Sequence, residues 1–346
     1  MRKVVIFILL VLLIALPVSA EEFIAPEAPE AAQDLMPVET KTFGDGLWKI
    51  LQNALPVIQP AVAGGCKLCV CVICIVLLTS LLKGVSGETS GVLTLAAIVA
   101  IGGVLLNTTG SMIRLGTDTV KELSEYGKLL LPVMTGALAA QGGAASSAAL
   151  YAGTVVFDTV LSGAVAGVLI PLIYIFLALS IAAAAIGQES IKKIGDFVKW
   201  LMSWFLKVVL YIFTGYMTVT GVVSGGADAT AVKAAKITIS GMVPVVGGIL
   251  SDASEAVVVS AGVVKNAAGV YGLLAVAAIW ISPFLQIGVQ YLLLKATAAV
   301  CGVFDVKACT QLVSGFSAAM GLVLAAVGAV CLLHLISTVC FMRGVL

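Results

Sequence analysis

Residues Gly163 to Ile186 read GAVAGVLIPLIYIFLALSIAAAAI, an apolar run without a charged side chain. A helix of about 20 such residues crosses the ~30 Å hydrocarbon layer of a bilayer. The composition of the whole chain agrees, because 61% of its 346 residues are hydrophobic and only 11% are charged. A soluble domain has roughly 45–50% apolar and about 25% charged residues. We therefore expect lipid to surround much of the protein surface.

Other apolar stretches predict further spans. The strong candidates are Val62–Leu82, Gly91–Ile113, Gly163–Ile186, Val208–Gly225, Val270–Leu294 and Gly315–Met342. Two weaker stretches, Leu129–Leu150 and Met242–Val264, could each be a full span, a re-entrant segment or an interfacial helix. The sequence thus predicts an all-α, polytopic transmembrane helix bundle with six to eight spans, in which the 36 glycines allow helices to approach closely.

The N-terminal region divides into two parts before the membrane domain. Residues 1–20 have a basic start, an apolar core and small residues up to Ala20, the pattern of a signal peptide; an uncleaved first helix is the alternative. Residues 21–61 form an acidic, proline-rich extracytoplasmic lead, whose segment Phe43 to Ile58 we expect to lie along the membrane surface. Residues 62–346 form the polytopic membrane domain.

An amphipathic helix is predicted over Gln188 to Lys207. Apolar residues recur at helical spacing from Ile191 to Phe205, and polar residues such as Lys192 and Lys199 occupy the opposite side. Such a helix, with its two tryptophans at the headgroup boundary, is typical of an interfacial position. A solvated connecting helix is the alternative.

Two patterns suggest a metal site or a catalytic site, but helix geometry argues against both. The cysteines between Cys66 and Cys74 point in different directions on a helix, so they cannot converge on one metal ion. Ser317 and His334 lie in one expected helix, about 25 Å apart at 1.5 Å per residue, so they cannot form a nucleophile and its base. Scattered basic residues and a net charge of +1 argue against nucleic-acid binding. We expect no catalytic residue, metal or cofactor.

Asp158 lies close to the start of the Gly163–Ile186 span. A carboxylate inside a membrane is costly and therefore suggests a function. No strongly apolar span offers a second acid, which argues against an aspartyl protease. We interpret Asp158 as a helix-terminus or pore-lining group.

Residues 240–255 read SGMVPVVGGILSDASE. Pro244 and the glycine pair after it predict a break in a helix, and Asp252 with Glu255 predicts an N-cap at which the helix restarts. A break at membrane depth must face protein or a water-filled cavity; an ordinary surface loop is the alternative. The candidate pore-facing or partner-facing residues are Asp158, Pro244, Gly247, Gly248, Ser251, Asp252 and Glu255.

The same stretch closely resembles the stage III sporulation protein AE family of endospore-forming bacteria. The resemblance rests on Ser240-Gly241, on Val243 to Gly248, on Leu250 to Asp252 and on Glu255. It implies a subunit of a channel or secretion-like complex that links mother cell and forespore, located in the mother-cell membrane around the forespore and required for late forespore development.

The partners implied by this resemblance are other membrane proteins of the same complex and the lipid bilayer, with further copies of this chain left open. A secondary transporter is the rival interpretation, because discontinuous helices also build transporter sites. The two halves of the chain show no convincing repeat, which argues against a transporter. An intramembrane enzyme is the third alternative.

Overall fold

The computed structural model describes residues 26–37, 43–83, 90–242, 247–304 and 306–343, except for the side chains of residues 90 and 221–265. Every regular element in these ranges is helical, which confirms the all-α prediction. The predicted signal peptide, residues 1–20, lies outside the described residues.

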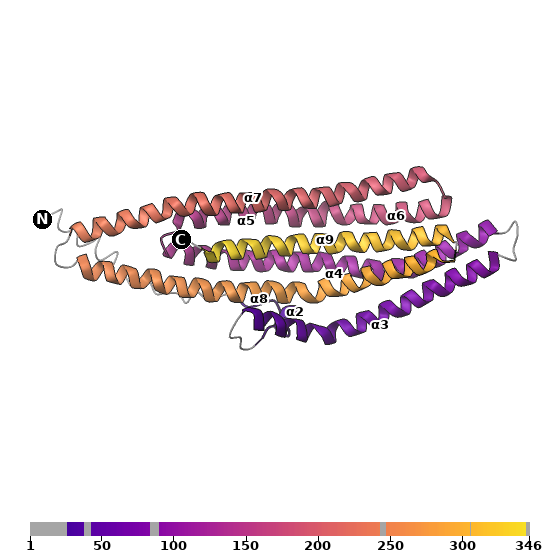
Figure 1. Ribbon diagram of the computed structural model, residues 1–346, viewed down its shortest axis with the longest axis horizontal. Coiled ribbons are helices and arrows are strands. Elements are labelled where there is room, and N and C mark those ends of the chain that lie inside the picture. Colours follow the sequence, from indigo (N-terminus) through magenta and orange to yellow (C-terminus); the bar gives the residue numbers. More distant parts are fainter. Residues whose placement is uncertain (1–25, 38–42, 84–89, 243–246, 305, 344–346) are drawn as a thin grey trace.

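Most of the described elements are long helices that lie side by side (Figure 1). They are α2 (Glu30–Gln33), α3 (Phe43–Lys83), α4 (Ser90–Ala140), α5 (Ala144–Ala164), α6 (Ile170–Ile186), α7 (Glu189–Met242), α8 (Gly247–Gly302) and α9 (Lys307–Arg343), with a π-helical turn η2 (Val165–Leu169) that joins α5 to α6. Taking α5, η2 and α6 as one rod, six helices are long and apolar enough to cross a membrane. Each of the six strong predicted spans lies in a different one of them.

The helices are far longer than a single crossing requires. α8 has 56 residues and α7 has 54, so at 1.5 Å per residue each is about 80 Å long, against about 30 Å of hydrocarbon. Two segments that we expected beside the spans are continuous with the spanning helices. Residues Phe43 to Ile58 form the start of α3, which curves and contains Pro56 and Pro60 (Figure 1), and the amphipathic segment that begins near Gln188 forms the start of α7.

The two weaker stretches, each predicted to be a full span, a re-entrant segment or an interfacial helix, differ in the structure. Leu129–Leu150 is not a span, because it contains the end of α4, a turn in which Gly142 has a φ of 90°, and the start of α5. In the second stretch, Pro244 lies outside the described residues. The prediction that Asp252 caps a restarting helix is wrong, because α8 begins at Gly247 and already includes Asp252.

Helices α8 and α9 form the centre of the bundle. In their most apolar windows 61% of residues are buried, compared with 22–33% in the other four rods. α9 packs against α4, α5, α6, α7 and α8, whereas α3 lies at one side against α8 and α4 (Figure 1). The outer rods expose large apolar side chains such as Val99 and Tyr211, as expected for surfaces that face lipid.

Candidate functional site

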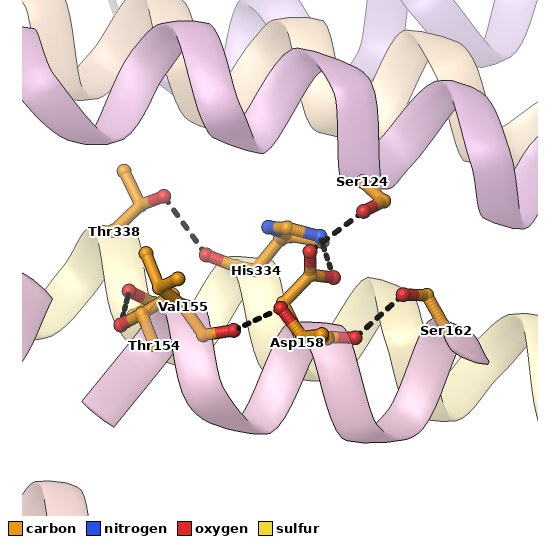
Figure 2. Close-up of polar contacts among 9 residues, drawn as sticks. Ser124, Thr154, Val155, Asp158, Ser162, His334 and Thr338 are labelled. Atoms are coloured by element: carbon orange, nitrogen blue, oxygen red, sulfur yellow. Dashed lines mark hydrogen bonds and ion pairs between the residues drawn. The ribbon is translucent and has the colours of Figure 1, made fainter. Parts of the chain in front are cut away.

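A buried contact between a histidine and an aspartate joins α5 to α9. His334, the single histidine of the chain, lies in α9 and is 3% exposed. Its Nε2 atom lies 3.2 Å from Oδ1 of Asp158 in α5, which is also 3% exposed (Figure 2). The structure therefore brings together two groups that the sequence separates by more than half the chain.

Helix α4 completes the site from the other side. The Ser124 hydroxyl donates a hydrogen bond of 2.6 Å to Oδ2 of Asp158 (Figure 2). One turn further along α4, Gly127 lies against the imidazole of His334, and a Cβ atom there would lie 2.7 Å from Nδ1. The missing side chain of Gly127 is thus what allows the imidazole to pack directly on the α4 backbone.

A second polar contact lies one turn away between α5 and α9. The hydroxyl oxygens of Thr154 and Ser337 are 2.6 Å apart and buried. Thr154 precedes Asp158 by four residues and Ser337 follows His334 by three, so the two contacts are neighbours on antiparallel helices. Sliding α5 along α9 by one turn would break both. Together they fix the register of the two helices.

The energetic cost of breaking this site is large. A buried polar group that loses its partner costs about 1–3 kcal/mol, and a buried charged group costs more. Most other buried side chains of α9 are apolar, and their contacts are not directional. We call Asp158, His334 and Ser124 the Asp158 cluster. The directional contacts within this cluster therefore favour one arrangement of α4, α5 and α9 over others.

The Asp158 cluster does not have the serine–histidine contact of a catalytic triad. In such a triad the serine hydroxyl donates its hydrogen bond to the imidazole. Here Ser124 donates to the carboxylate of Asp158, and the imidazole lies on the other carboxylate oxygen. The geometry suits a buried polar lock between helices.

The surroundings of the cluster differ on its two sides. The outer face of α4 at this level is charged, with exposed side chains at Asp118, Lys121, Glu125 and Lys128. The outer face of α5 is apolar, with Val156 and Val160 at least half exposed. The cluster thus lies near a level at which α4 meets a polar environment while α5 still presents an apolar surface.

The sequence singled out Asp158 but did not predict its surroundings correctly. The helix-terminus interpretation is wrong, because Asp158 lies inside α5 and the chain continues as helix through η2 into α6. Its carboxylate points toward α4 and α9 rather than away from the bundle (Figure 2). Pairing with His334 was missed, although one signal was available: each group is costly alone in an apolar span, and each is the natural partner of the other.

The other candidate residues lie elsewhere. Ser317 and His334 share α9 as predicted, and the Ser317 hydroxyl donates to the carbonyl oxygen of Tyr291 at 3.2 Å. Of the clustered cysteines on α3, Cys69 is buried and the other three are exposed. Positions 247, 248, 251, 252 and 255 lie in the part of α8 whose side chains are not described.

Comparison with known proteins gives a family. The family model described as Stage III sporulation protein AE matches residues 32–344. The chain is also 26% identical over 196 residues to Stage III sporulation protein AE of Bacillus subtilis (strain 168), a region that covers 56% of this chain. That region covers 49% of the relative, so the match spans about half of the relative's length.

No solved structure matches the chain. The family model, in contrast, covers nearly all of α2 to α9, including the Asp158 cluster. The six long apolar helices agree with a membrane location. This chain is a membrane protein that belongs to the stage III sporulation protein AE family.

Proposed function

We propose that this protein is a non-enzymatic, multi-pass subunit of a channel or secretion-like complex that links mother cell and forespore and is required for late forespore development. The observation that carries the proposal is the family match over residues 32–344, which supports a role in sporulation. Six helices able to span a membrane support a place for the protein within the mother-cell membrane around the forespore.

The buried contacts support a scaffolding role within such a complex. A subunit that holds neighbouring membrane proteins in fixed positions must keep its own helices in one arrangement. The Asp158 cluster and the Thr154–Ser337 contact do this for α4, α5 and α9. We propose that their role is to hold the outer helices in the geometry that partner subunits bind.

The surface of α3 offers a place for those partners. α3 packs against α8 and α4 and leaves large apolar side chains exposed, among them Val70 at 60% and Leu81 at 67%. In a membrane such a surface is covered by lipid or by another membrane protein. Cys71 and Cys74 are exposed on the same helix, so they provide native attachment points for a cross-linking reagent.

Localisation together with cross-linking tests the proposal. A functional fluorescent fusion should concentrate at the engulfing septal membranes during sporulation, whereas an unrelated polytopic protein of the mother cell should be spread evenly. A membrane-permeant bismaleimide should link the wild-type chain to other sporulation membrane proteins, and a Cys66→Ala/Cys71→Ala/Cys74→Ala variant should lose these products. An even distribution of the fusion with no sporulation protein among the cross-linked products would contradict the proposal.

A further inference from the structure

A cavity of about 290 Å³ lies between α6, α7 and α9, apart from the Asp158 cluster. Its polar lining includes Lys192, Asp196 and Lys199 of α7, Gln311 and Ser314 of α9, and the hydroxyl-bearing Ser180 and Thr310. Ser314 and His334 are separated along α9 by about 30 Å at 1.5 Å per residue. The cavity is therefore a second polar feature, one hydrocarbon thickness away from the first.

The start of α7 has one polar face at this cavity and exposed aromatic residues on another face. Lys192, Asp196 and Lys199 are spaced by four and three residues, so they share one helix face, and all three line the cavity with exposed side chains. On the other face, Phe197 is 59% and Trp200 is 57% exposed, and their rings stack at a centroid distance of 5.9 Å. Exposed tryptophans beside lysines are typical of a membrane helix at the headgroup boundary. We conclude that lipid contacts the outside of α7 here.

The cavity lining carries more positive than negative charge. Among the described residues, no acidic side chain forms an ion pair with the amine of Lys192 or of Lys199. Two lysines and one aspartate give the lining a net charge of +1. A ligand group of charge −1 would neutralise it. The remaining lining includes apolar Phe176, Leu179 and Ile191.

We propose that this cavity binds the headgroup of an anionic phospholipid, with the phosphate between the amines of Lys192 and Lys199. A phosphodiester carries one negative charge, and amines are strong donors to its oxygens. Asp196 would accept hydrogen bonds from hydroxyl groups of the headgroup, and the apolar wall would contact the first carbons of the acyl chains. The lipid-facing exterior of α7 favours a lipid over a soluble phosphate. The proposal does not rest on the sporulation complex.

Lipid titration tests this site. The full-length protein, purified in a delipidating detergent, would be titrated with phosphatidylglycerol or with phosphatidylcholine, and bound lipid would be counted by native mass spectrometry. We expect the wild type to bind phosphatidylglycerol more tightly. Basic residues near a membrane contribute about 1 kcal/mol each, or about fivefold in affinity per lysine, so Lys192→Gln/Lys199→Gln should lose most of this preference.

Matched variants separate the cavity from overall charge. Lys193→Gln/Lys207→Gln removes the same charge from exposed positions of α7 that do not line the cavity, and it should keep the preference. Ser314→Leu, which obstructs the cavity without a change in charge, should lower phosphatidylglycerol binding. Three results would overturn the proposal: no lipid preference in the wild type, equal losses in the two double-lysine variants, or displacement of the lipid when phosphate replaces chloride at constant ionic strength.

Discussion

Replacing Gly127 by alanine places one methyl group at the contact between α4 and His334. The added carbon would press on the imidazole and lie 2.7 Å from Nδ1 and 3.4 Å from Nε2. The same edge of the imidazole carries Nε2, which lies 3.2 Å from Oδ1 of Asp158. We expect Gly127→Ala to push His334 out of its position and to weaken its contact with Asp158.

The size of the effect follows from comparison with Gly110 on the same helix, where an added Cβ meets no atom within 4 Å. Glycine to alanine in a helix interior gains about 1 kcal/mol in helix propensity, and both variants receive this gain. Overpacking a well-packed interior costs about 1–3 kcal/mol, and only Gly127→Ala pays this cost. The difference between the two variants should therefore be about 1–3 kcal/mol.

Thermal unfolding in a mild detergent provides the measurement. Gly127→Ala should melt below Gly110→Ala, and Gly110→Ala should melt at or above the wild type. In a His334→Ala background the penalty of Gly127→Ala should disappear, because the group with which it collides has been removed. Equal melting temperatures for the two glycine variants, or a penalty that persists without the imidazole, would refute the proposed packing.

Three further substitutions test other parts of the structure. Asp158→Ala should lower the free energy of unfolding by about 1–3 kcal/mol, because Ser124 and His334 lose their buried partner, whereas Asp118→Ala, whose side chain is 65% exposed, should change it by no more than about 0.5 kcal/mol; equal effects in a detergent melt would exclude a buried contact. Thr154→Val should cost about 1–3 kcal/mol by leaving the Ser337 hydroxyl unpaired, and the exposed Thr159→Val should serve as the neutral control in the same melt. Gly247→Leu should lower spore yield while the protein still accumulates in membranes; normal spore yield would show that the first residue of α8 has no functional role.

The sequence predicts the transmembrane architecture well because burial in lipid leaves a strong compositional signal. Apolar runs such as Gly163–Ile186 have no other stable environment, so the number of strong spans and the all-α class follow directly. Helix length does not follow in the same way. The residues that extend α7 and α8 beyond a bilayer are amphipathic or mixed, and their helicity depends on packing against neighbouring helices.

The sequence could predict individual residues of the candidate site but not the contacts between them. Asp158 attracts attention because a carboxylate is costly in an apolar segment, but its partner lies on α9, and contacts between distant helices depend on register. The same limit applies to Lys192 and Lys199. Their spacing predicts a polar helix face, yet only the position of α6 and α9 shows that this face lines a cavity while the aromatic residues point outward.

Heat-resistant spore yield in a strain that lacks this chain tests the central claim most directly. The native gene would be deleted and then restored at a second site as wild type, as Asp118→Ala or as Asp158→Ala, and membrane abundance would be measured in the same cultures. We predict that the deletion arrests forespore development, that the wild type and Asp118→Ala restore it, and that Asp158→Ala does not restore it fully. Normal numbers of heat-resistant spores in the deletion strain would contradict the proposed function.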